Sequence, residues 1–177
     1  DEMKAVDLCQ VMRSIRDSGR PNTVLWQAPD SIAFVARGRE LRSEFHSDPS
    51  DEVMYMIKGD MNLHYRTPDG EEKVAVVREG EIVYCPAGTP HSPRFSPESF
   101  VLVLERKRRG DENDRFTWYC EQCGAQLHES VKHVADYRED PSLLTVLSYG
   151  HGDVVGGMVG EWRDNLDPWR TTVKGER

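Results

Sequence analysis

Several features that define other protein classes are absent from this sequence of 177 residues. No apolar stretch approaches the ~20 residues needed to cross a bilayer, and no signal-peptide core follows the N-terminus. Acidic residues outnumber basic ones by 31 to 23, and the net charge of −8 argues against a nucleic-acid-binding protein. Four cysteines are too few for a disulfide scaffold at this length. We therefore expect a cytoplasmic protein with one hydrophobic core and no membrane or nucleic-acid partner.

The spacing of apolar residues changes near residue 20. Residues 4–18 place them at helical intervals, and a Gly-Arg-Pro segment then stops the pattern, which predicts an N-terminal helix. Beyond Thr23, short apolar runs alternate with turn signals such as Asp-Gly at 69–70, a pattern typical of antiparallel strands. The runs comprise residues 24–27, 32–36, 53–57, 61–65, 73–77, 82–85 and 100–104. No helix-length pattern interrupts them, so we predict an all-β sandwich or barrel of the jelly-roll kind.

These patterns divide the chain into three segments. We assign residues 1–20 to an N-terminal helical segment, residues 21–110 to the barrel, and residues 111–177 to a loop and helix extension that packs on the barrel. Residues 106–109 are all basic and precede an acidic stretch, so we interpret them as an exposed loop. A short helix is expected within residues 129–147.

Two segments of the predicted barrel combine a strand, a turn and side chains that can bind a metal ion. The first carries His46 and Glu52, and the second ends in His91. Two histidines and one carboxylate on one face of a metal leave about three adjacent positions open, which suits Fe(II) that must hold a substrate and dioxygen. The sequence therefore predicts an iron site at these three residues. The other histidines lack ligand-like spacing; they are His64, His128, His133 and His151.

The frames around these ligands resemble the metal motifs of the cupins. The spacing Gly80-x5-Pro86-x-Gly88-x2-His91 resembles the second motif, and His46-x5-Glu52-x6-Gly59 resembles the latter part of the first. Glu44 stands where the first motif usually has a histidine. Over residues 21–129 the sequence is more closely similar to the 3-hydroxyanthranilate 3,4-dioxygenase family of small cupins. The resemblance is carried by residues 26–27, 42–52, Tyr55, 86–93, 104–106 and 116–124.

This resemblance implies a cupin barrel that converts 3-hydroxyanthranilate to 2-amino-3-carboxymuconate semialdehyde, with Fe(II) as cofactor and O2 as co-substrate. It also implies that Arg42, Glu105 and Asn22 contact the substrate, together with an arginine shortly after the second histidine. Arg94 is the natural counterpart of that arginine, although the chain is one residue shorter there than the His-Ser-Pro-Gln-Arg typical of the family. In these roles the two arginines hold the substrate carboxylate, and Glu105 takes and returns a proton.

Arg42 has a further argument from position alone. It precedes His46 by four residues on the same predicted strand, so both side chains point to the same face. A buried arginine there is costly without an anion, which predicts an anionic ligand such as a small aromatic amino or hydroxy acid.

Other functions remain open at this point. The same chemistry on a related o-aminophenol or catechol carboxylate is the main alternative; a cupin isomerase or epimerase, a thiol dioxygenase and a small-anion-binding cupin are others. Cys120 and Cys123 form one Cys-x-x-Cys pair, whereas bacterial members of the family hold a second iron with two such pairs. We therefore do not expect a second metal at Cys120 and Cys123. A homodimer is the expected assembly.

Overall fold

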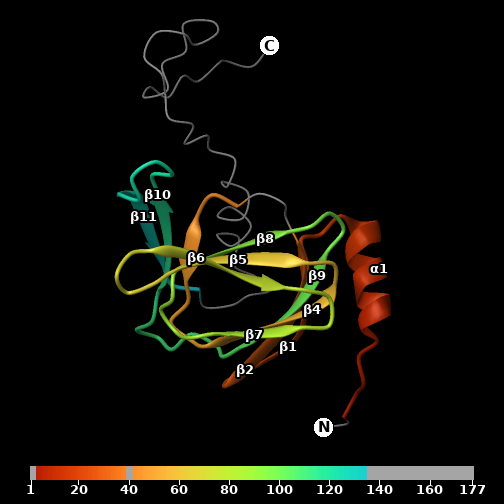
Figure 1. Cartoon of the computed structure of the whole chain (residues 1–177). Coiled ribbons are helices and arrows are strands. Elements are labelled where there is room, and N and C mark those ends of the chain that lie inside the picture. The colour runs from red at the N-terminus through yellow and green to blue at the C-terminus, as the bar shows by residue number, and fades with distance from the viewer. Residues whose placement is uncertain (1–2, 39–41, 135–177) are drawn as a thin grey trace, which may run out of the picture.

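Two antiparallel sheets form the body of the protein in the computed structural model, which describes residues 3–38 and 42–134 (Figure 1). One sheet has the strand order β1-β2-β9-β4-β7, and the other has the order β11-β10-β3-β8-β5-β6. The strands are β1 (Asn22–Ala28), β2 (Ser31–Arg37), β3 (Phe45–Ser47), β4 (Glu52–Lys58), β5 (Met61–Arg66), β6 (Glu72–Val77), β7 (Ile82–Cys85), β8 (His91–Phe95), β9 (Phe100–Glu105), β10 (Asp114–Tyr119) and β11 (Gln126–Lys132). The prediction of an all-β jelly-roll barrel with a short N-terminal helix is confirmed.

The helix α1 (Leu8–Ser18) packs on the outside of the five-stranded sheet. It begins after Asp7, whose carboxylate accepts hydrogen bonds from the backbone N–H groups of Cys9 and Gln10, as is typical of an N-cap. The side chain of Ile15 in this helix is fully buried against Val35 of β2 and Phe100 of β9. No helix within the described ranges has the length and apolar character that crossing a membrane requires.

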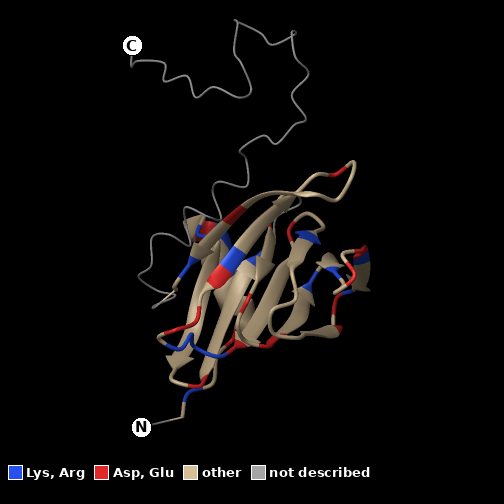
Figure 2. Cartoon of the chain, turned by 90° about the vertical axis from the view of Figure 1, so that its left-hand side faces the viewer, with Lys and Arg blue, Asp and Glu red and all other residues tan. Residues whose placement is uncertain are grey.

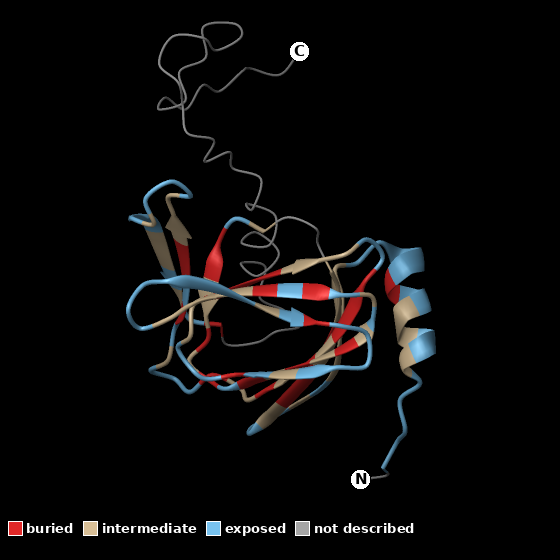
Figure 3. Cartoon of the chain, viewed as in Figure 1, coloured by how far each residue is buried: buried red, intermediate tan, exposed pale blue. Residues whose placement is uncertain are grey.

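The main core lies between the two sheets, and buried positions alternate along strands such as β4 (Figure 3). On β4 the side chains of Glu52, Met54 and Met56 share the inner face, because side chains two residues apart in a strand point to the same side. Two of these pack in the apolar core, which also contains Met61, Leu63, Val77, Cys85, Val101 and Val103. The alternation that builds the core therefore also carries the carboxylate of Glu52 into the interior.

Two strands of the six-stranded sheet lie beyond the predicted barrel boundary at residue 110. β10 pairs with β3, so that Phe116 lies opposite His46, and β11 pairs with β10. Residues 114–132 thus belong to the sheet that carries a candidate ligand, and do not form a separate layer packed on it. Of the helix expected within 129–147, residues 129–132 lie in β11; residues 135–147 lie outside the described residues.

Charged residues of both signs are interspersed along the strands and connections (Figure 2). Some form exposed ion pairs, such as Arg115 with Glu129 at 3.0 Å. The basic run 106–109 does not behave as the exposed loop that its composition predicts, because Arg108 is buried and Arg106 is paired with Glu112.

Candidate metal centre

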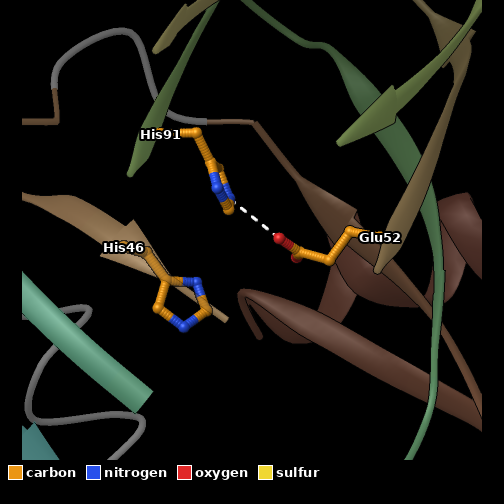
Figure 4. Close-up of side chains that lie close together, drawn as sticks. All are labelled: His46, Glu52 and His91. Carbon is orange, nitrogen blue, oxygen red and sulfur yellow. Dashed lines mark ion pairs between the residues drawn. The ribbon is translucent and has the colours of Figure 1, made fainter. Parts of the chain in front are cut away.

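Three strands bring His46, Glu52 and His91 to one place inside the barrel. The two histidines lie directly opposite each other on the paired strands β3 and β8, and Glu52 begins β4 in the facing sheet. Their potential ligand atoms all lie within 4.8 Å of one another. Figure 4 shows the three side chains directed toward a shared space, with His91 Nε2 3.0 Å from Glu52 Oε2. The structure therefore brings together the three residues that the sequence predicts as ligands.

The ring of His91 is oriented by the turn that precedes its strand. Nδ1 lies 3.0 Å from the carbonyl oxygen of Thr89 and donates its proton there, which leaves Nε2 unprotonated and directed at Glu52. Burial and the nearby His46 lower the pKa of His91 to about 3, so the imidazole is neutral at physiological pH. A neutral, oriented imidazole is the form that binds a metal ion.

His46 is held by a residue of the strand β10, which the sequence placed outside the barrel. Its Nε2 lies 2.7 Å from Asp114 Oδ1, and its ring stacks on Phe116 with the centroids 4.8 Å apart. Burial alone raises the pKa of Asp114, but hydrogen bonds from Arg108 and His46 hold that pKa at about 2. An ionised carboxylate behind a ligating histidine fixes the ring and increases its basicity.

The chemistry of these donor groups fits a divalent cation. Glu52 Oε2 is buried and has no hydrogen-bond donor, although it faces the unprotonated Nε2 of His91 at 3.0 Å. At this distance the lone pairs of the nitrogen and the oxygen repel each other unless a proton or a cation lies between the two atoms. Burial, and then the charge of Asp48, raise the pKa of Glu52 to about 8, and a bound cation reverses that effect. Two imidazole nitrogens and one carboxylate are a ligand set typical of non-haem Fe(II).

A pocket adjoins the three candidate ligands and contains three of the four predicted substrate residues. Arg42, Glu105 and Asn22 line it. Arg42 Nε donates to Glu44 Oε1 at 2.8 Å, and Glu44 itself is buried in the pocket wall. The apolar part of the lining consists of Pro21, Phe34, Ala36, Met54, Pro93, Phe95, Val101, Val103 and Phe116. A lining that combines these polar groups with many apolar side chains is suited to an aromatic acid.

The structure does not bring Arg94 into this pocket. Alternation along β8 directs His91, Pro93 and Phe95 into the pocket, whereas Arg94 lies between two of these inward positions and is not part of the lining. Because the chain is one residue shorter here than the family pattern, Phe95 stands four residues after His91, on the same face. A shift by one residue moves a side chain to the opposite face of a strand.

Sequence reasoning missed three buried charged residues beside the candidate ligands. Asp48 and Asp114 are 2% and 1% exposed, and the Arg108 side chain is fully buried. The interpretation of Arg108 as part of an exposed loop is wrong, because three carboxylates surround its guanidinium. The available signal was the unusually high local density of acidic residues, at 48–52 and 111–114, which a buried cation can balance.

The Cys120–Cys123 pair lies in the turn between β10 and β11, where the backbone N–H of Gly124 donates to the carbonyl of Cys120. Hydrogen bonds from the backbone N–H groups of Cys123 and Gln122 lower the pKa of the Cys120 thiol. Among the described residues, no group of three close metal-ligating side chains includes either cysteine. Of the other two thiols, Cys9 is exposed on α1, and burial raises the pKa of Cys85 to about 12.

The two-sheet barrel and the two-histidine, one-carboxylate site define the protein as a cupin with a candidate metal centre. The model of the family described as 3-hydroxyanthranilic acid dioxygenase matches residues 3–145. The chain belongs to this family.

Known relatives agree with this assignment. A protein from Bacillus thuringiensis named 3-hydroxyanthranilate 3,4-dioxygenase is 33% identical over 153 residues, covering 80% of this chain and 84% of the relative. Proteins of the same name from Bacillus cereus and Cupriavidus pinatubonensis are 38% and 40% identical. These matches cover 65% and 61% of this chain, and they span 64% and 58% of the two relatives, which is less than two thirds of each.

Proposed function

We propose that the protein is an Fe(II)-dependent dioxygenase that opens the ring of 3-hydroxyanthranilate to form 2-amino-3-carboxymuconate semialdehyde. The observation that carries this proposal is the meeting of His46, Glu52 and His91 at a pocket that also contains Arg42 and Glu105. His46, Glu52 and His91 would hold the iron, which would supply a centre at which an aminophenol and dioxygen can exchange electrons. Both oxygen atoms enter the product as one ring carbon–carbon bond breaks, so no external reductant is required.

Arg42 is suited to hold the carboxylate of the substrate. Its guanidinium is planar and permanently charged, and it has further N–H donors beside the Nε that is bound to Glu44. Glu44 fixes the direction of the side chain from within the pocket wall, where it is 1% exposed. A carboxylate bound at Arg42 keeps the ring within the same pocket, which apolar side chains also line.

Glu105 is suited to accept the hydroxyl proton of the substrate and to return a proton during ring opening. It ends β9, lines the pocket and is 7% exposed. Its Oε1 accepts a hydrogen bond from Arg108 Nη1 at 3.2 Å. A carboxylate that lines the pocket and is largely buried from bulk water can transfer a proton with little competition from solvent.

The decisive experiment loads the protein anaerobically with Fe(II) and adds 3-hydroxyanthranilate and oxygen. We expect stoichiometric oxygen uptake together with the absorbance of the semialdehyde product. Uptake only with another o-aminophenol or a catechol carboxylate favours the alternative substrate class, for which the apolar Phe95 on the pocket face is the supporting observation. No uptake with any of these compounds contradicts both functions.

The contrast between Arg42 and Arg94 gives a sharper prediction. Arg42→Met should raise KM for 3-hydroxyanthranilate about 10–100-fold, because a hydrogen-bonded charged contact contributes roughly 1.5–3 kcal/mol. Arg94→Met should leave KM unchanged, since Arg94 lies outside the pocket lining. Steady-state kinetics measure both variants, with 2-aminophenol, which lacks the carboxylate, as a substrate whose KM Arg42→Met should not raise. An equal rise of KM in the two variants contradicts the role given to Arg42.

The homodimer and the cytoplasmic location expected from the sequence remain predictions. The homodimer is expected because most soluble oligomers are symmetric dimers. The cytoplasmic location is expected from the composition of the sequence.

A further inference from the structure

Arg108 lies at the centre of a buried cluster of three carboxylates. It follows the end of β9 by three residues, and its side chain has no exposed surface. Nε donates to Asp114 Oδ2 at 2.8 Å, Nη1 donates to Glu105 Oε1 at 3.2 Å, and Nη2 forms an ion pair with Asp48 Oδ2 at 2.7 Å. Nη2 also donates to Asp114 Oδ1 at 2.5 Å, so one guanidinium contacts all three carboxylates and uses all three of its nitrogen atoms. The arrangement uses the forked shape that lysine lacks.

Two of these carboxylates also belong to the candidate site. Asp114 contacts Nε2 of the candidate ligand His46 at 2.7 Å, and Glu105 lines the pocket as the proposed proton acceptor. A continuous path of polar contacts therefore runs from His46 through Asp114 and Arg108 to Glu105. It joins the two sheets, because His46 and Asp114 lie in the six-stranded sheet and Glu105 lies in the five-stranded one.

The position of Arg108 excludes a direct role in holding the substrate. Arg108 is not part of the pocket lining, and the nitrogen atoms of its guanidinium are engaged by Asp48, Glu105 and Asp114. It consequently does not replace the arginine that Arg94 fails to provide. Its effect on the site must pass through the carboxylates that it holds.

We propose that Arg108 is a positioning residue that keeps Glu105 and His46 at a fixed separation. It holds Glu105 directly and holds His46 through Asp114. The proposal rests on the proposed function for the role of Glu105. Proton transfer requires the carboxylate to lie within hydrogen-bond reach of the substrate. Because the substrate is placed by the metal centre, the distance between Glu105 and that centre determines whether the proton can move. Arg108 fixes this distance from behind the pocket wall.

The test is Arg108→Lys, which retains the charge but removes the fork. With saturating Fe(II), we expect kcat to fall about 100-fold, the effect of a displacement of roughly 1 Å at a catalytic group, while KM stays within about threefold. The matched control is Arg106→Lys, since Arg106 pairs with Glu112 and is not in the pocket lining. An unchanged kcat in folded Arg108→Lys overturns the proposal.

A double-mutant cycle with Glu105→Gln separates positioning from a general structural effect. If Arg108 acts through Glu105, adding Arg108→Lys to Glu105→Gln should lower kcat no more than about threefold further, because linked residues are not additive. Full additivity of the two losses overturns the proposal. Should Arg108→Lys fail to fold, Arg108→Gln with Asp48→Asn, which removes one of the three carboxyl groups around the guanidinium, replaces it in the cycle.

The visible absorption spectrum of the Co(II)-loaded protein tests the connection to His46 without any turnover. Arg108→Lys should change the position or intensity of the Co(II) bands relative to the unmodified protein, whereas Arg106→Lys should not. Identical spectra for Arg108→Lys and the unmodified protein contradict the link through Asp114. If the unmodified protein consumes no oxygen with any aminophenol or catechol, the proposed function fails, and the Co(II) spectra still decide whether Arg108 orients His46.

Discussion

His91→Ala should abolish Fe(II) binding and, with it, all oxygen uptake. His91 is 2% exposed, and its Nε2 is the unprotonated nitrogen that faces Glu52. Loss of an outer-shell partner alone costs about 10–100-fold in metal affinity, so loss of a ligand should weaken Fe(II) binding by more than about 100-fold. Iron content after gel filtration, and competition with a chromogenic chelator, measure the change.

The control for this variant is His64→Ala. His64 lies on the neighbouring strand β5, opposite Ser92, and contacts Glu72 outside the pocket. It should retain full iron content. If removal of the buried ring unfolds the protein, His91→Gln preserves most of the volume and should still lose iron. A folded His91 variant with full iron content shows that the metal lies elsewhere.

Glu105→Gln should lower kcat about 10²–10⁴-fold, the usual contribution of a positioned general acid or base. The amide oxygen can still accept the hydrogen bond from Arg108 Nη1, so the local structure should persist. Iron content and KM for 3-hydroxyanthranilate should remain within about threefold, because the ligands and Arg42 are untouched. Steady-state kinetics with a parallel iron assay measure the separation of kcat from binding.

The matched substitution is Glu71→Gln, at an exposed glutamate paired only loosely with Lys73 at 3.4 Å. It should leave kcat, KM and iron content unchanged. A Glu105→Gln variant that retains full kcat means that the substrate proton leaves by another route, and Glu105 then has no catalytic role.

Local patterns were sufficient for most of the barrel. The strands predicted from 24 to 104 all appear, because apolar residues that alternate with polar ones have one low-energy arrangement, with the apolar face buried. The helix begins at Leu8, four residues later than the predicted segment, because Asp7 caps it. The prediction did not include β10 and β11 in the barrel. A strand can pair with a sheet edge from any distance along the chain, and the spacing of residues in the sequence does not reveal which strands pair or in which register.

The candidate metal ligands could also be predicted from the sequence, because each lies in a short motif with a fixed spacing to nearby turn residues. Arg94 shows where this reasoning ends. Its residue type suits a carboxylate, but the face that it occupies on β8 depends on counting residues from His91, and one missing residue reverses the face.

The sequence by itself determined the type of fold and the three candidate metal ligands. The prediction that Arg42 lies on the strand of His46 was wrong, because β3 begins only at Phe45, yet Arg42 still lines the pocket. Only the tertiary structure decided that Arg108 is buried among Asp48, Glu105 and Asp114 and that Arg94 is outside the pocket. Periodicity and motif spacing predict which face of a helix or strand a residue occupies, because that face depends only on nearby residues in the sequence. The burial of a charge depends on which partners arrive from other strands to neutralise it, and the packing of the two sheets sets that arrangement.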